Sequence, residues 1–244
     1  MKSIWIHDYT NIDRTFGPKI TQQCVERLAK SGFDTIIINN TNGLGEDIVN
    51  IIRQSPYAKR FKVYQWILEP FKRNKSIEKP LKNRDGFILD IEPLFIKKPK
   101  DLNIRSVFTK WGEHPKERKV LCLPSPDFII SYKIRGYVDW INYLKETNQL
   151  DYVDFIMVME YVSYPNSFFK PLWLIKLEVD YLKRLSGKKV IPIFSVYDWN
   201  EWFAKLVINK QIKLFKKAIN EFDDWSVFAW SYPLYSLLRG EIYG

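Results

Sequence analysis

The feature of this 244-residue chain that most restricts its fold is an eightfold alternation of short apolar runs with longer segments of helical periodicity. The runs are continuously apolar, as in parallel strands that are buried on both faces. Segment 18–31 begins with a proline and is followed by Gly32, as helix ends prefer. The expected strands are 3–7, 34–40, 61–68, 86–92, 119–125, 153–161, 189–199 and 225–232, and the expected helices are 18–31, 44–54, 101–112, 134–147, 171–185 and 208–222.

This order predicts an α/β protein with a single (β/α)8 TIM barrel over residues 1–244. A doubly wound open sheet is the alternative, but no glycine-rich phosphate turn follows the first run. Gly43 and Gly45 fit a turn and a helix start better than a phosphate loop. We expect one domain, since no linker or low-complexity segment interrupts the pattern.

The net charge of +10 raises nucleic acid as a partner, but the lysines are scattered along the chain. A solvated basic face explains them better, and we expect no nucleic-acid partner. No run of eighteen apolar residues predicts a membrane span. The amino-terminal segment reads as a strand and not as a signal peptide, so we expect a cytoplasmic protein or one exported without a visible signal.

Cysteine and histidine usage argues against a metal site. Cys24 and Cys122 both lie in apolar patterns and are expected to be buried free thiols. His7 and His114 are too few and too far apart in sequence for a zinc cluster. We therefore expect no metal and no organic cofactor.

In a barrel of this kind the active site lies at the carboxyl ends of the strands. Polar and aromatic residues gather at the predicted ends of most strands. These residues are His7, Asp8, Asn39, Asn40, Gln65, Trp66, Asp90, Glu92, Glu160, Tyr161, Tyr197, Asp198 and Trp230. Aromatic residues are 16% of the chain, which suits either a sugar-stacking surface or a core of large side chains.

Asp90 and Glu92 are the pair of residues that most directly indicates a catalytic site. Residues two apart in a strand face the same side, with Cα atoms roughly 6.6 Å apart. Two carboxylates so placed interact, and one of them keeps its proton to higher pH. An acid beside a carboxylate is what glycosidic cleavage needs. The alternative is a pair of solvated acids bound to a lysine.

Other strand ends leave two interpretations open. One interpretation is that Asp8 and His7 bind sugar, and the other is that they only close the barrel. Asn39 and Asn40 either donate hydrogen bonds to sugar hydroxyls or form a turn. Trp66 is core or a platform for a sugar ring. At the sixth strand, either Tyr161 or Glu160 faces the mouth, and the pattern favours Tyr161.

The stretch from Asp85 to Glu92 resembles the fourth-strand signature of family 18 glycoside hydrolases, the chitinases and endo-β-N-acetylglucosaminidases. That signature is Asp-x-x-Asp-x-Asp-x-Glu. Asp85, Asp90 and Glu92 match it, and Ile88 replaces its second Asp. The resemblance implies that Glu92 is the general acid and base. It also implies that Asp90 orients the N-acetyl group of the substrate, whose oxygen attacks the anomeric carbon.

Two further motifs are similar to that family. Met159 and Tyr161 match its Met-x-Tyr-Asp at the sixth strand, with Val162 in place of the Asp. The resemblance implies that Tyr161 holds the acetamido oxygen. Trp230 in the eighth run stands where the family has a tryptophan that stacks under the reacting sugar.

The Asp90–Glu92 pair predicts a glycoside hydrolase. The resemblance implies that it cleaves an N-acetylhexosamine-containing oligo- or polysaccharide by a retaining, substrate-assisted mechanism. A muramidase-like enzyme that uses Glu92 is one alternative, and an inactive chitinase-like binding protein is another. The second carboxylate of the muramidase-like enzyme would be Asp90, Asp8, Glu160 or Asp198. Glu92, Asp90 and Tyr161 are the expected catalytic residues. The expected substrate-binding residues are Trp230, Asp8, Asn39, Gln65, Glu160, Tyr197 and Asp198.

Overall fold

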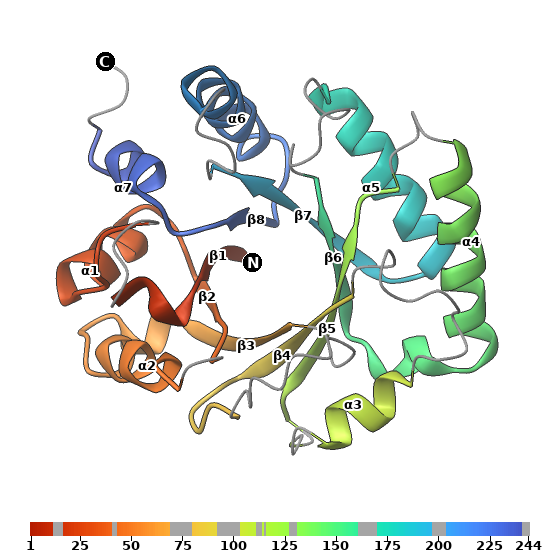
Figure 1. Cartoon of the computed structure of the whole chain (residues 1–244), viewed down its shortest axis with the longest axis horizontal. Coiled ribbons are helices and arrows are strands. Elements are labelled where there is room, and N and C mark those ends of the chain that lie inside the picture. Colours follow the sequence, from red (N-terminus) through yellow and green to blue (C-terminus); the bar gives the residue numbers. More distant parts are fainter. Residues whose placement is uncertain are drawn as a thin grey trace.

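The computed structural model describes residues 1–11, 17–40, 43–68, 80–91, 103–110, 114, 116–126, 131–160, 170–196 and 204–240. Within these ranges, eight parallel strands pair in sequence order, and the last pairs with the first to close a barrel. Figure 1 shows the strands at the centre of the molecule and the helices around them. The predicted (β/α)8 barrel is confirmed, and the open sheet is excluded.

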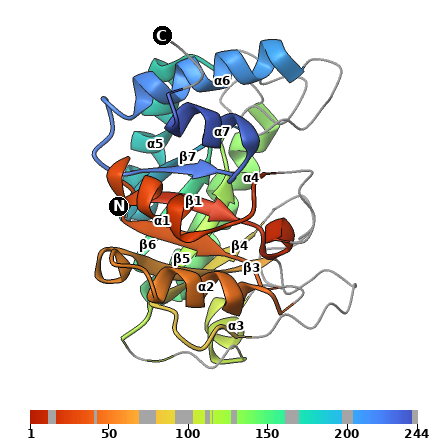
Figure 2. The ribbon, with the colours of Figure 1, turned by 90° about the vertical axis from the view of Figure 1, so that its left-hand side faces the viewer.

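The strands are short and follow the predicted apolar runs closely. Their bounds are β1 (Lys2–Ile6), β2 (Thr35–Ile38), β3 (Lys62–Leu68), β4 (Gly86–Asp90), β5 (Arg118–Pro124), β6 (Phe155–Met159), β7 (Lys189–Ser195) and β8 (Trp225–Phe228). Figure 2 shows the barrel from the side, with helices packed along the strands.

The helices cover the outer face of the barrel. The α-helices are α1 (Gln22–Lys30), α2 (Gly45–Arg53), α3 (Ile104–Lys110), α4 (Ser131–Glu146), α5 (Leu172–Ser186), α6 (Ala204–Ala218) and α7 (Tyr232–Leu238). Short 3-10 helices are η1 (Asp8–Asn11), η2 (Ala58–Arg60) and η4 (Gln149–Tyr152).

Two helix predictions need correction. The first helix begins after Thr21 and not at Pro18, because the Thr21 side chain caps it by accepting a hydrogen bond from the Cys24 amide at 3.4 Å. Helix α7 was not predicted; Ser231 caps it, and Pro233 occupies its first turn, where a missing N–H costs nothing.

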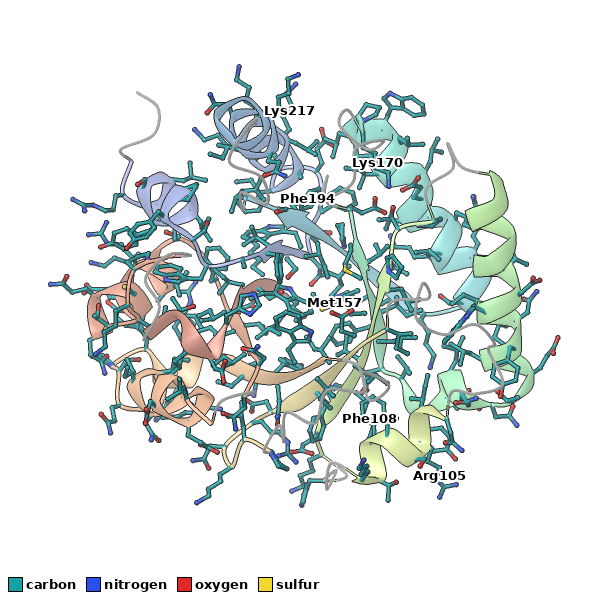
Figure 3. All side chains as sticks on the ribbon, in the orientation of Figure 1. Arg105, Phe108, Met157, Lys170, Phe194 and Lys217 are labelled. Atoms are coloured by element: carbon teal, nitrogen blue, oxygen red, sulfur yellow. The ribbon has the colours of Figure 1, made fainter. Side chains whose placement is uncertain are left out.

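Side chains of each strand alternate between the lumen of the barrel and the layer under the helices. The lumen cluster is Trp5, Ile37, Tyr64, Trp66, Ile88, Val120, Cys122, Met157, Ile191, Ile193, Phe228 and Ala229. Figure 3 shows Met157 near the barrel axis, whereas Phe108 and Phe194 lie outside the strands, against the helices. The barrel is therefore a filled core with side chains on both faces of the sheet.

Two local devices let large side chains fit inside the lumen. Tyr64 lies across Gly86, where a Cβ atom would come within 2.5 Å of the Tyr64 ring. Ser226 accepts hydrogen bonds from the Ser3 hydroxyl and from the Trp5 indole nitrogen, both at 2.8 Å. Polar groups buried in the lumen are thus paired at this level.

The amino ends of the strands alternate in charge around the barrel. A lysine or arginine begins each odd strand, and an aspartate immediately precedes each even strand. The four aspartates, here called the amino-end ring, are Asp34, Asp85, Asp154 and Asp224. Three of them each accept a backbone N–H from the preceding odd strand, namely those of Lys2, Val63 and Lys119, at 2.7–2.8 Å.

The fourth member of the ring, Asp224, binds two cations. Its carboxylate pairs with the Lys189 ammonium at 2.5 Å and with the amino-terminal amine of Met1. Partial burial opposes ionisation, but these two cations outweigh it and hold the pKa of Asp224 below its usual range. The ring therefore joins the first and last strands where the barrel closes.

Two further expectations can be compared with the structure. Cys24 and Cys122 are buried and free, as predicted. Among the described residues, no helix has the length and apolarity that crossing a membrane requires.

Candidate functional site

Asp90 is the last residue of β4 and faces the lumen at the carboxyl end of the barrel. It pairs in register with Cys122, a member of the lumen cluster, and it is 6% exposed. The indole nitrogen of Trp66 donates a hydrogen bond of 3.1 Å to Asp90 Oδ2. This bond holds the carboxylate in one orientation at the mouth.

Trp66 is the centre of an aromatic group at this end of the lumen. Its ring packs edge-on against Trp5, with centroids 5.0 Å apart, and against Phe228 at 5.7 Å. His7 lies 5.1 Å from the same ring. Trp66 is 4% exposed, so it is core and also positions Asp90, and it is not an open platform.

His7, Asp8 and Asn39 form a hydrogen-bonded group beside these aromatic rings. The Asp8 amide donates to Asn39 Oδ1 at 2.7 Å, and Asn39 Nδ2 lies 3.5 Å from His7 Nδ1. The His7 ring also lies 5.6 Å from that of Phe228. Burial among these groups lowers the pKa of His7 to about 4, so the imidazole is neutral at neutral pH.

Asn40 has a structural role of the kind expected for a turn. Its Oδ1 accepts the Gly45 amide at 2.9 Å, which holds the start of α2 against the end of β2. A Cβ atom at position 45 would come within 2.9 Å of this oxygen, so a glycine is needed for the contact.

Gln65 was predicted to bind substrate, and the structure corrects this. It is adjacent to Trp66 in β3, and only one of two neighbouring residues can face the lumen. Gln65 faces outward, is 0% exposed and accepts the Leu81 amide at 2.8 Å. Its role is to hold the chain segment that precedes β4.

Glu160 was also predicted to bind substrate, and it too faces away from the lumen. Its neighbour Met159 packs against the lumen cluster, so Glu160 is directed under α5. There Lys170 Nζ lies 2.5 Å from Glu160 Oε2, pairs with Glu178 and donates to Ser125 Oγ at 2.8 Å. We call Glu160, Lys170 and Glu178 the buried triad. This position removes Glu160 as a second catalytic carboxylate.

Burial and the opposite charges of the partners act against each other in the buried triad. Burial raises the pKa of the Glu160 carboxyl well above its usual range, and this effect exceeds the attraction of Lys170. Burial opposes the charge on Lys170, but Glu160 and Glu178 together raise its pKa. The triad thus places a lysine between two buried acids, and burial makes the Glu160 carboxyl harder to ionise.

Trp230 does not lie under a sugar site. It is 1% exposed, packs in the layer outside the barrel, and donates from Nε1 to the Pro18 carbonyl at 2.7 Å. Its ring contacts Tyr235 of α7 at 5.6 Å. The aromatic residue that β8 presents to the lumen is Phe228, which the sequence prediction missed although it stands two positions before Trp230.

Four predicted site residues lie outside the described residues: Glu92, Tyr161, Tyr197 and Asp198. Their roles stay predictions. The structure brings together Asp90, Trp66, His7 and Asn39 through the contacts given above. Asp8 joins this group through its backbone amide, and the residue is 0% exposed, so, contrary to the prediction, its side chain is not open to a substrate. Asp85, the first acid of the family 18 motif, lies at the opposite end of β4, where Arg53 binds it at 2.9 Å.

Comparisons with known proteins agree with the fold. No family model matches the chain, and no curated protein matches it. The chain is similar in structure to a glucosidase from Croceicoccus marinus, with 8% sequence identity and a TM-score of 0.50. The match covers 89% of this chain and 56% of that one, so the chain spans little more than half of that protein. At this identity the likeness shows the barrel fold alone.

The arrangement at the carboxyl end combines three chemical properties. It has a carboxylate held by an indole N–H, apolar aromatic walls and a neutral imidazole. Among the described residues, no three His, Cys, Asp or Glu side chains are grouped so that they could hold a metal ion. Such a site suits a neutral organic ligand with an apolar face and polar edges, as sugars have.

Proposed function

We propose that this protein is a glycoside hydrolase that cleaves a glycosidic bond in an N-acetylhexosamine-containing glycan. The observation that carries the proposal is the placement of Asp90. It lies at the carboxyl end of β4, faces the lumen and is held by the Trp66 indole. The structural likeness to a glucosidase with the same barrel fold is consistent with this proposal.

In the proposed mechanism, Glu92 protonates the leaving oxygen and later activates water. Asp90 orients the acetamido group of the substrate so that its carbonyl oxygen attacks the anomeric carbon. The carboxylate then stabilises the positive charge that develops on the cyclised intermediate. Tyr161 hydrogen-bonds the same acetamido group. The hydrogen bond from Trp66 supports this role because it fixes the orientation of Asp90.

A non-catalytic glycan-binding protein is the second candidate, and Ile88 favours it. Family 18 signatures have an acid at this position, whereas Ile88 is fully buried in the lumen cluster. The Trp66 indole donates to Asp90, and position 88 supplies no acid beside it. An enzyme whose catalytic strand has lost an acid can retain the binding function alone.

A glycan screen with matched variants separates the two candidates. Wild-type protein is incubated with chitin oligosaccharides and N-glycans, and products are measured by mass spectrometry. We expect turnover that falls by about 10²–10⁴-fold in Glu92→Gln, which retains shape but cannot transfer a proton. Binding of these glycans without any turnover by the wild type would support the binding protein and contradict the enzyme.

A further inference from the structure

Hydrogen bonds at the carboxyl end of the barrel fix which nitrogen of His7 carries the proton. The Asp8 amide donates to Asn39 Oδ1 at 2.7 Å, which sets the orientation of the Asn39 amide. Asn39 Nδ2 then faces His7 Nδ1 at 3.5 Å. An NH2 group can only donate, so in a neutral imidazole Nδ1 is the acceptor and Nε2 carries the hydrogen.

The surroundings keep this imidazole neutral and partly accessible. The Trp66 and Phe228 rings pack against it, and the side chain is partly exposed at the mouth. Asp8 is its neighbour in sequence, and Asp90 accepts a hydrogen bond from Trp66, whose ring packs against His7. Burial lowers the pKa of His7 to about 4.

We propose that His7 is a substrate-binding residue that donates a hydrogen bond from Nε2 to an uncharged oxygen of the glycan, a hydroxyl or an acetamido carbonyl. This inference rests on the proposed function and names the polar contact made by β1. The Asp8–Asn39–His7 hydrogen bonds orient the donor before the ligand arrives. A preoriented donor loses less conformational freedom on binding.

The tautomer can be measured directly because the protein has only two histidines. Long-range ¹H–¹⁵N spectra of ¹⁵N-labelled protein, assigned with His114→Gln, report the protonation of each ring nitrogen. We expect His7 to show an unprotonated Nδ1 and a protonated Nε2 at pH 7. We also expect its Nε2 resonance to shift when N-acetylglucosamine-thiazoline binds. A protonated Nδ1, or ligand binding that leaves the His7 resonances unmoved, would overturn the inference.

Two substitutions of His7 test whether the ligand needs a hydrogen-bond donor at the position of Nε2. The amide nitrogen of Gln lies near the place of Nε2, whereas that of Asn lies near Nδ1. We expect His7→Gln to bind the thiazoline within about threefold of wild type and His7→Asn to bind about tenfold more weakly, as loss of one hydrogen bond predicts. Equal affinities of the two folded variants would overturn the role of His7.

The same titration distinguishes failure of the inference from failure of the proposed function. Wild-type protein that is folded but does not bind the thiazoline would count against the proposed function, and the glycan contact of His7 would fail with it. Wild-type binding with equal affinity in both His7 variants would leave the proposed function intact and reject only the His7 contact.

Discussion

The two ends of this barrel use charged residues in opposite ways. At the amino end, aspartates of the amino-end ring are bound by backbone N–H groups and by cations from neighbouring strands. At the carboxyl end, Asp90 is held by a neutral indole and lies among aromatic rings and a neutral imidazole. The amino end holds the strands together through these contacts, and the carboxyl end is the one to which we assign the proposed glycan site.

A carboxylate with a cationic partner has its charge balanced within the protein, whereas the Trp66 indole that donates to Asp90 is neutral. The buried triad resembles the amino-end ring in this respect, because Glu160 and Glu178 share Lys170. It lies near the carboxyl end of β6 but on the helix side of the sheet. We therefore assign it to structure, and the predictions below test this division.

The largest effect is expected from breaking the buried triad. Lys170→Met leaves two acids under α5 without their cation, and removing one partner of a buried ion pair typically costs about 3–5 kcal/mol. Urea unfolding should show a decrease of this size in the free energy of unfolding. Lys176→Met is the control, because Lys176 pairs with Glu221 at the surface and such pairs contribute about 1 kcal/mol or less. Equal effects of the two substitutions would contradict the buried triad.

His7 should make stability depend on pH. Its folded pKa of about 4 is below the unfolded value of 6.5, so between these pH values the unfolded chain binds the extra proton. The contribution of neutral His7 is complete above pH 6.5 and is lost as pH falls towards 4, by about 3 kcal/mol. We expect urea unfolding of His7→Gln to lack this loss. An identical pH dependence in wild type and variant would show that His7 is not buried as described.

A smaller effect, on ligand affinity, is expected when the hydrogen bond from Trp66 to Asp90 is removed. Trp66→Phe keeps an aromatic ring in the lumen but removes the indole N–H that binds Asp90. Loss of one hydrogen bond to a charged group predicts about 10-fold weaker binding of N-acetylglucosamine-thiazoline, measured by calorimetry. Trp225→Phe, at a tryptophan outside the lumen, is the control and should bind as wild type. Equal weakening in both would mean that the effect is general loosening and not the Asp90 contact.

The smallest effect is expected at the amino-end ring. Asp154→Ala removes the acceptor of the Lys119 amide and the partner of Arg118, and both contacts are partly exposed. We expect a loss of about 1 kcal/mol in the free energy of unfolding and no change in thiazoline affinity. Asp154→Asn keeps an acceptor oxygen and should lose less. A change in ligand affinity would contradict a purely structural role for this end.

The sequence was sufficient to predict the barrel because the order of apolar runs and helical segments is a property of the chain alone. It also placed Asp90 and Asn39 correctly at the carboxyl end of the lumen. Orientation within strands was harder. Strands that are buried on both faces are apolar at every position, so the pattern does not show which neighbour faces inward. Gln65 and Glu160 were misplaced for this reason.

Contacts between distant segments could not be predicted either. Trp230 packs against Pro18, and the triad joins the end of β6 to α5 through Lys170. Both depend on how the helices lie on the barrel, which no local pattern encodes. Neutral His7 depends likewise on packing, since an isolated histidine carries no sign of the rings that will bury it.

The most direct test of the account is a thermal shift measurement with N-acetylglucosamine-thiazoline on wild type, Asp90→Ala and Asp90→Asn. The thiazoline imitates the cyclised intermediate of the proposed reaction. We predict that it raises the unfolding temperature of the wild type, that the increase disappears in Asp90→Ala, and that Asp90→Asn retains little of it. An equal increase in all three proteins, or none in folded wild type, would contradict the role of Asp90 in binding the acetamido group.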